Sequence, residues 1–453
     1  MDGLPVRGLS WLGIVRLGLV QSALGSIVVL TTSTLNRVMA VELALPVALP
    51  AALVAWHYVV QLSRPRWGHG SDQGRRRTPW IVGGMGVLAL GALLATNATA
   101  LMASSTVAGI VLAIIAFSMI GAGVGAAGTS LLALLATRVA PARRPAAAAI
   151  TWIMMIVGIV LTAGIGGGLL DPFSMQRLAI VASGVALIAF LVTLVAVLGV
   201  EGPAVVPTSP AETRTPFAEA LKETMADPKA RLFAIFVLVS MVAYSAQELI
   251  LEPFAGLVFA MTPGQSTQMS GVQNGGVLLG MVLVGALGGF IGGRGRGGAR
   301  GGVMRGWTIA GCVGSAAMLG LLTAAAAIGP SWPILPTVFG LGFFNGMFAV
   351  AAIGSMMGLA GEGRDQERGG PREGIRMGVW GAAQALGFAA GGFLGAVGVD
   401  IGRGLMGADA PAFGLVFTLE AGLFLASALI ASRIGAPASS VASPVTGARH
   451  VQA

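Results

Sequence analysis

Twelve long apolar stretches dominate this sequence and constrain its fold more than any other feature. They run over residues 12–38, 43–62, 80–102, 107–136, 147–170, 178–200, 232–259, 269–292, 307–328, 334–360, 375–398 and 412–433. An α-helix needs about 20 residues to cross a hydrocarbon core of ~30 Å, so each stretch is long enough to span a membrane. Only 10% of the 453 residues are charged, against about 25% in soluble domains. The sequence therefore predicts an all-α membrane protein with twelve transmembrane helices.

The residue types outside this pattern narrow the class further. The 70 glycines indicate helices that pack closely through small residues. One cysteine excludes both a disulfide scaffold and a thiolate metal cluster. With three histidines, one of them near the C-terminal end, no Ser/His/Asp set or metal-ligand cluster can be assembled. We therefore expect no enzymatic activity.

Basic residues are distributed unevenly among the predicted loops. Of the 27 Lys and Arg, 24 lie at the termini or in connections on one side of the membrane, and only Arg37, Arg177 and Arg403 lie on the other. Since Lys and Arg accumulate in cytoplasmic loops, both termini are predicted to be cytoplasmic. The net charge of +9 is thereby explained by topology, and we expect the lipid bilayer, and no nucleic acid, as its partner.

The longest polar stretch divides the spans into two groups of six. We expect residues 1–200 to form an N-terminal six-helix half and residues 231–434 to form a C-terminal one. A 6+6 arrangement with both ends inside is the plan of the major facilitator superfamily, whose halves are parallel repeats. The predicted fold class is therefore a major-facilitator-type bundle.

Two segments are predicted to lie outside the helical halves. Residues 201–230 read as a cytoplasmic linker that contains a short amphipathic helix, because Phe217, Leu221 and Met225 recur at helical spacing. Residues 435–453, rich in Ala, Ser, Pro and Val, are predicted to be a disordered cytoplasmic tail.

One predicted cytoplasmic loop resembles the signature loop of the superfamily, which has the form G-x-x-x-D-[RK]-x-G-[RK]-[RK]. The matching residues are Gly68, Asp72, Gly74, Arg75 and Arg76. Here the interval between Asp and Gly is one residue shorter, and Gln73 replaces a basic residue. In the pattern the Asp pairs with neighbouring helix ends and basic groups and fixes one conformation of the half. The alternative is an ordinary basic turn.

The seventh span carries two carboxylates within the predicted bilayer. Glu248 and Glu252 are four residues apart and share one helix face. Both are functional candidates, because burying an ionisable group in a membrane is costly. Pro253 frees a backbone carbonyl one turn earlier, where a ligand or water can approach, and the neighbouring Gln247 is a further candidate ligand-binding residue. The alternative is that both acids are solvated at the periplasmic end of the helix.

Arg37, at the end of the first span, is not explained by the usual charge bias. Glu42, Glu248 and Glu252 are each possible partners, and the sequence does not decide among them. We include Asn36, Arg37 and Glu42 among the predicted ligand-binding residues.

His57 lies inside the second span. A neutral imidazole is a common metal ligand, so His57 is a candidate for the magnesium of a tetrapyrrole. The alternative is a packing histidine that is hydrogen-bonded to a neighbouring hydroxyl or carbonyl group.

Three segments together resemble the PucC/LhaA family of major-facilitator-like proteins. They are Thr34 to Met39 with Val41 to Leu43 and Pro46, Arg64 to Asp72 continuing into Arg76 to Trp80, and Gln247 to Gly256. In the third motif the family often has an Asp at the position of Glu248. The twelve-span layout extends the resemblance over nearly the whole chain.

Members of that family are described as bacteriochlorophyll delivery or light-harvesting assembly factors of phototrophic bacteria. The resemblance implies a protein of the bacterial inner membrane, in its cytoplasmic or intracytoplasmic photosynthetic part. It implies that the protein binds (bacterio)chlorophyll or a related magnesium tetrapyrrole and delivers it to light-harvesting apoproteins. A (bacterio)chlorophyll synthase is a further partner that the resemblance implies.

Two other functions stay open from the residues alone. One is a proton-coupled transporter of a small amphipathic solute that uses Glu248 or Glu252 as its proton site. The other is a ligand-free scaffold for pigment-synthesis enzymes and antenna helices. Scarce charge near the middle of the spans favours pigment handling, since a solute carrier needs polar groups that converge there.

Overall fold

A computed structural model describes residues 9–64, 67, 76–140, 143–201, 226, 228–292, 297–361 and 373–434. Eleven of its helices are long and apolar enough to cross a membrane, and the helix Ala48–Gln61 is a shorter apolar one. The described residues therefore form a twelve-helix membrane bundle, as the apolar stretches predict.

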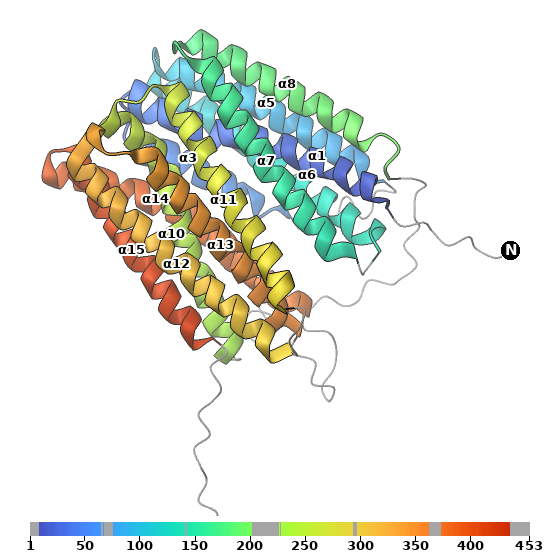
Figure 1. The fold of residues 1–453 in the computed structure, drawn as a ribbon. Coiled ribbons are helices and arrows are strands. Elements are labelled where there is room, and N and C mark those ends of the chain that lie inside the picture. Colours follow the sequence, from blue (N-terminus) through green and yellow to red (C-terminus); the bar gives the residue numbers. More distant parts are fainter. Residues whose placement is uncertain are drawn as a thin grey trace, which may run out of the picture.

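Among the described residues, six helical crossings form the first half of the bundle, which Figure 1 shows in blue to green. The first crossing is continuous and combines α1 (Trp11–Val29), η1 (Leu30–Thr34), α2 (Leu35–Arg37) and η2 (Val38–Glu42), and it is followed by α3 (Ala48–Gln61), α5 (Thr78–Met102), α6 (Thr106–Arg138), α7 (Arg144–Leu170) and α8 (Met175–Val197). Helices α5 and α6 pack tightly against each other, and α7 and α8 lie against α1.

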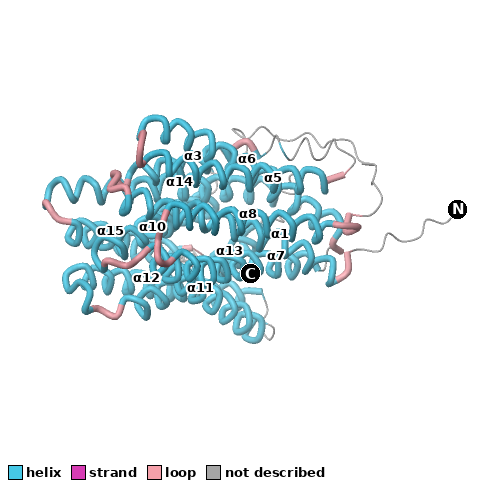
Figure 2. Tube along the Cα trace, turned by 90° about the horizontal axis from the view of Figure 1, so that it is seen from above, coloured by secondary structure: helices cyan, strands magenta, loops and turns pink. Residues whose placement is uncertain are grey.

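The second half repeats this pattern. It consists of α10 (Pro228–Phe259), α11 (Pro263–Gly292), α12 (Gly297–Ile328), the short 3-10 turn η4 (Gly329–Ser331), α13 (Ile334–Gly361), α14 (Glu373–Met406) and α15 (Asp409–Arg433). Seen from above, the two groups of helices lie side by side (Figure 2). They meet where α7 lies against α11 and where α3 lies against α14.

Glycine permits the close approach of α7 and α11. A Cβ atom placed on Gly167 would lie 2.8 Å from the carbonyl oxygen of Gly264, and one on Gly271 would lie 3.2 Å from the Ala163 Cβ. Backbones at this separation exclude larger side chains, which is typical of helix contacts in membranes. The two halves are therefore in direct contact along these helices.

The two ends of the bundle differ in their connections. We call the end that carries residues 43–47, 103–105, 171–174, 260–262, 329–333 and 407–408 the distal end. The opposite, proximal end is where α1 begins and α15 ends (Figure 1). The charge distribution predicts that the proximal end is cytoplasmic, and this orientation stays a prediction.

Several span boundaries differ from those expected. Helix α12 begins at Gly297 instead of at residue 307, and α14 ends at Met406 instead of at residue 398. Two further differences bear on the contact between the halves. The second span, expected over 43–62, is helical only over Ala48–Gln61. Proline at position 46 cannot continue the hydrogen-bonding pattern of a helix, and residues 43–47 form an irregular connection. The eighth span, expected over 269–292, begins at Pro263 instead. Its polar first turns are buried between the halves, where Ser266 and Thr267 are fully covered.

Several predicted features lie outside the described residues. They are the linker with its amphipathic helix over 202–225, the tail over 435–453, and the loop residues Gly68, Asp72, Gly74 and Arg75. Arg76 is described, and it is exposed just before α5 begins.

Helix α5 is capped by a residue from another part of the chain. The N-cap residue Arg77 supplies no capping side chain. Instead, the carboxylate of Glu201, which follows α8, accepts the N–H of Thr78 at 2.9 Å and the N–H of Arg77. Burial alone would raise the pKa of the Glu201 carboxyl, but hydrogen bonds from the Thr78 hydroxyl and these N–H groups outweigh it, so the pKa is lowered. The folded state thus favours the charged form.

The stabilisation of α5 by Glu201 is expected to depend on pH. Glu201→Gln should destabilise the protein by about 1 kcal/mol at pH 7, the usual magnitude for a helix cap. The folded-state pKa lies below the unfolded value of about 4.3. The stabilisation is therefore complete above that value and is lost as the pH falls through the folded-state pKa. Thermal unfolding in mild detergent should show a difference between Glu201→Gln and the wild type at pH 7 that shrinks near pH 3. An equal difference at both pH values would exclude the charge as its cause.

Candidate functional site

Two π-helical turns interrupt the first crossing where the candidate residues lie. Turns Leu30–Thr34 and Val38–Glu42 flank the short α-helical segment that carries Asn36 and Arg37. At the first turn the hydroxyl groups of Thr31 and Thr32 donate to main-chain carbonyl groups one turn earlier. Such turns are often found at functional sites, because they change the direction of side chains without ending the helix.

The second π-turn determines the partner of Arg37. Arg37 Nη1 donates to Glu42 Oε1 at 2.5 Å. Residues five apart lie on different faces of an α-helix, but the i to i+5 hydrogen bond from Leu43 N–H to the Val38 carbonyl places them on the same face. Of the three partners that the sequence left open, the structure selects Glu42 for the ion pair.

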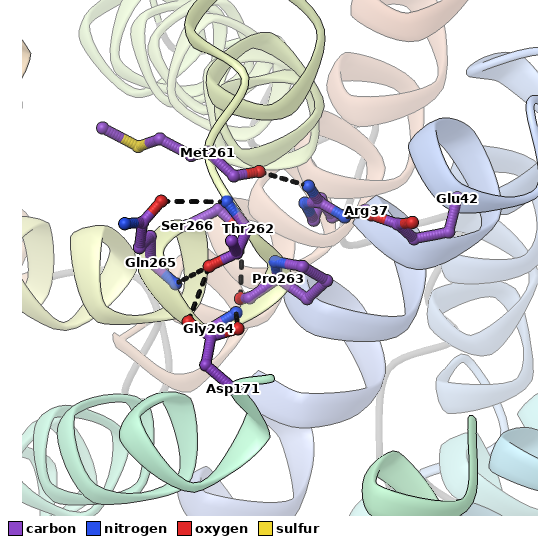
Figure 3. A network of polar contacts seen from close by, with 9 residues as sticks. All are labelled: Arg37, Glu42, Asp171, Met261, Thr262, Pro263, Gly264, Gln265 and Ser266. Carbon is purple, nitrogen blue, oxygen red and sulfur yellow. Dashed lines mark hydrogen bonds and ion pairs between the residues drawn. The ribbon is translucent and has the colours of Figure 1, made fainter. Parts of the chain in front are cut away.

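Arg37 also joins the two halves. Its Nη2 donates to the Met261 carbonyl oxygen, 2.5 Å away, in the connection between α10 and α11. Figure 3 shows the guanidinium group between this carbonyl and Glu42. Arg37 is 1% exposed, so its charge is compensated almost entirely by these protein groups.

Two aspartates make further contacts between the halves at the distal end. Asp171, after α7, accepts the Thr262 hydroxyl at 2.6 Å and the Gly264 N–H at 3.4 Å (Figure 3). Asp400 of α14 accepts the N–H groups of Val47 at 3.1 Å and Ala48 at 2.8 Å, at the start of α3. We call the Arg37–Met261, Asp171–Thr262/Gly264 and Asp400–Val47/Ala48 contacts the distal clasp. All of these contacts join one half to the other.

A proline on α10 explains a deeper contact between the halves. Helix α10 continues through Pro253, which has no N–H to donate to the carbonyl of Leu249. Asn36 Nδ2 donates to that carbonyl at 2.6 Å. The prediction that Pro253 frees a carbonyl for another group agrees with this geometry, but the group is a side chain of the opposite half.

Glu252 is buried next to this contact. It is 1% exposed, and its Oε1 accepts the Ser270 hydroxyl of α11 at 2.5 Å. Its Oε2 has no hydrogen-bond partner among the described residues. The guanidinium group of Arg37 also interacts with it electrostatically. Glu252 is therefore a buried carboxyl group with one oxygen available, and the alternative of two solvated acids does not fit it.

Gln247 has a different environment. Its side chain is 1% exposed, and neither amide atom has a hydrogen-bond partner among the described residues. At 100° per residue it points about 140° away from Glu252 around α10. The structure therefore does not bring Gln247 to the cluster formed by Asn36, Arg37 and Glu252.

Glu248 lies beside a cluster of aromatic side chains. The ring of Phe388 on α14 is 5.7 Å from that of Tyr58 on α3 and 5.7 Å from that of Tyr244 on α10. Glu248 lies one helical turn after Tyr244 on α10, and its charge is close enough to act on the hydroxyl groups of both tyrosines. We call Tyr58, Tyr244, Phe388 and Glu248 the aromatic cluster. All four are partly exposed, although they lie where the two halves meet.

The chain has only two tyrosines, and both belong to the aromatic cluster. A tyrosine combines a large flat ring with one hydroxyl group, which suits contact with a flat amphipathic ligand. The arrangement therefore provides aromatic faces, a carboxylate and two hydroxyl groups at one junction.

His57 contacts Tyr58 of this cluster and is more deeply buried than its four members. Its ring is 4.2 Å from that of Tyr58, and its side chain is 1% exposed. Nδ1 lies 2.7 Å from the Val54 carbonyl oxygen. Since a carbonyl only accepts, Nδ1 carries the proton and Nε2 is the free acceptor. This contact is the one expected of a packing histidine, and the role of His57 as a magnesium ligand stays a prediction.

Sequence reasoning missed several residues that the structure brings to the junction. They are Asp171, Thr262, Thr267, Ser270, Phe388 and Asp400. The polar pattern of Ser266, Thr267 and Ser270 at helical spacing was the available signal for the start of α11. Within the described residues, no three His, Cys, Asp or Glu side chains gather as a metal site.

The bundle and this junction define an integral membrane protein of the major-facilitator type. The model of the family described as PUCC protein matches residues 34–438, and the chain belongs to the PucC family. The "Bacteriochlorophyll synthase 44.5 kDa chain" of Rhodobacter capsulatus is 51% identical over 427 residues, which cover 94% of this chain and 96% of the relative. "Protein PucC" of Cereibacter sphaeroides is 31% identical over 453 residues, with 95% and 92% covered.

The contact between Asn36 and the carbonyl freed by Pro253 can be tested by a double-mutant cycle. Asn36→Leu should lower the free energy of unfolding by about 1–3 kcal/mol, because it leaves the Leu249 carbonyl unpaired. Pro253→Ala restores an N–H one turn later, so Asn36→Leu should cost at least about 1 kcal/mol less in that background. Unfolding in mixed micelles measures both values. Additivity within about 0.5 kcal/mol would contradict this account of the carbonyl.

Proposed function

We propose that this protein binds (bacterio)chlorophyll in the membrane and delivers it to light-harvesting apoproteins during antenna assembly. We propose the bacterial inner membrane as its location, with both termini cytoplasmic, and a role without catalysis. Family membership and the name of the relative with 51% identity support a connection to this pigment. They also support a (bacterio)chlorophyll synthase as a partner that supplies the pigment.

The aromatic cluster is the observation that carries the proposal. A tetrapyrrole presents a flat apolar ring with polar groups at its edge, and aromatic side chains with hydroxyl groups match both features. The cluster combines helices of both halves and is partly exposed. A pigment in contact with it would touch α3, α10 and α14 together, so movement of the halves would change its binding.

Two residues are candidates to hold the magnesium. The Glu248 carboxylate supplies oxygen atoms, which magnesium prefers, and its side chain is partly exposed. His57 Nε2 could coordinate magnesium through its lone pair, but it lies on a side chain that is 1% exposed. Glu248 is therefore the better candidate for the magnesium ligand. For His57 to reach a bound pigment, α3 would have to shift.

Pigment retention tests the proposal. Protein purified in mild detergent from a phototrophic host should show a near-infrared bacteriochlorophyll band that co-elutes with it on size exclusion. Phe388→Ala should reduce this band at least about fivefold, because loss of one aromatic contact costs about 1 kcal/mol or more. The matched control is Phe343→Ala, which removes a partly exposed aromatic ring outside the aromatic cluster. A colourless wild type, purified with its antenna apoproteins present, would reject pigment binding. Equal loss in both variants would reject the site.

Glu252 supports a second candidate, proton-coupled transport of a small amphipathic solute. It is a buried carboxyl group with one free oxygen between the two halves, the place where coupling sites of such transporters lie. In this candidate, binding or loss of a proton on Glu252 would change the contact with Ser270.

The two candidates differ in what Glu252→Gln abolishes. For transport, pyranine-loaded proteoliposomes should report proton influx when a panel of amphipathic acids and amines is added, and Glu252→Gln should abolish it. For pigment delivery, Glu252→Gln should lower antenna levels in the host without any proton signal in vesicles. Normal antenna levels and no proton signal would leave Glu252 without either role.

A further inference from the structure

A second apolar feature lies on the first half, separate from the junction between the halves. A groove of about 330 Å³ lies between α5 and α6, with Trp67 and Trp80 at its proximal end. Gly83, Val87, Ala122 and Ala126 continue it along the two helices. Gly83 and Val87 are exposed, so within a membrane this groove faces lipid.

The groove has a basic edge at the proximal end. Arg64 is exposed, and its Cγ and the indole of Trp67 both lie against Gly125 of α6. Trp67 Nε1 donates to the Ser63 hydroxyl at 2.9 Å. Arg76 is also exposed and lies two residues before the start of α5. Tryptophan and arginine at the end of transmembrane helices are typical of the level of lipid headgroups.

The carboxylate at this end of α5 does not neutralise the basic edge. Glu201 is 9% exposed, and its oxygen atoms accept the N–H groups of Arg77 and Thr78. Arg64 donates to the neutral side-chain oxygen of Gln61. The charge of Arg64 also acts on Tyr58. A guanidinium group has five N–H donors, so among the described residues Arg64 keeps its charge and further donors for an anion.

The shape of the groove favours a chain over a ring. The centroids of Trp67 and Trp80 are 6.3 Å apart, and their planes are tilted by 57°. A macrocycle stacked between two rings would need about 7 Å and parallel planes. The volume is also at the low end of the ~300–1,000 Å³ that ligand pockets have.

We propose that this groove is a binding site for one anionic phospholipid. An acyl chain lies along Gly83 and Val87 between α5 and α6, and the phosphate lies at the level of Arg64, Arg76 and the two tryptophans. The groove then binds lipid and not pigment. Basic pockets between transmembrane helices on the cytoplasmic side bind acidic headgroups in this way, and the charge distribution predicts that the proximal end is cytoplasmic.

Glycine substitutions give a matched test of the groove. A Cβ placed on Gly83 would meet nothing within 4 Å, and the same holds for Gly184 on α8, which does not line the groove. Gly83→Leu therefore fills the groove without a clash from its Cβ, and Gly184→Leu is the control. Full-length protein is delipidated in detergent and incubated with phosphatidylglycerol or phosphatidylcholine, and native mass spectrometry counts the bound lipid.

Wild type and Gly184→Leu are expected to retain phosphatidylglycerol in preference to phosphatidylcholine. Gly83→Leu is expected to retain at least about tenfold less phosphatidylglycerol than wild type. Arg64→Gln should reduce the preference about fivefold, the effect of one basic residue near an acidic headgroup, and it tests the site without filling the groove. Equal retention in Gly83→Leu and Gly184→Leu would overturn the proposal, as would equal retention of the two lipids by the wild type. Loss of pigment from Gly83→Leu with unchanged lipid would assign the groove to pigment.

Discussion

The hydrogen bond from Asn36 to the Leu249 carbonyl follows from one constraint, that a backbone group inside a membrane must find a partner within the protein. Pro253 removes the helical partner of that carbonyl, and α10 nevertheless continues through it. Since the donor comes from the opposite half, the backbone hydrogen bonding of α10 at this point depends on contact between the halves. The Asn36 contact and the Arg37 contacts with Glu42 and Met261 come from neighbouring residues of the first crossing, and the candidate site forms around them.

The junction is organised along the membrane normal. At the distal end, the distal clasp joins the halves through charged side chains and backbone groups. Next comes the pair of Glu252 and Ser270, which is buried from solvent and lipid. The aromatic cluster is partly exposed. The polar contacts that hold the two halves together therefore lie at the distal end. A large amphipathic molecule would make its contacts further from that end, at the aromatic cluster.

The sequence predicts the membrane class and the twelve crossings, and it singles out Glu252, which the structure buries beside Ser270. The length of the apolar stretches and the distribution of basic residues are local properties of the sequence, so they can be recognised without knowledge of the tertiary structure. The partner of Arg37 was not predictable, because it depends on a π-turn that no simple periodicity reveals. Asp171 and Asp400 were missed for another reason: each caps backbone groups far away in the chain. The aromatic cluster needs three helices from two halves, and spacing within one span cannot show it.

The π-turn at Val38–Glu42 makes the pairing of Arg37 depend on the number of residues between the two charges. A π-turn holds one residue more than an α-helical turn. Because Arg37 and Glu42 are five residues apart, a regular α-helix would place the two side chains about 140° apart around the axis, so this interval requires the π-turn. A chain shorter by one residue here would form regular α-helix, and its arginine and acid would lie four residues apart on one face. The ion pair therefore couples the length of this segment to its helix type. Related chains that preserve the arginine and the acid are expected to have an interval of five residues with the π-turn or of four residues without it.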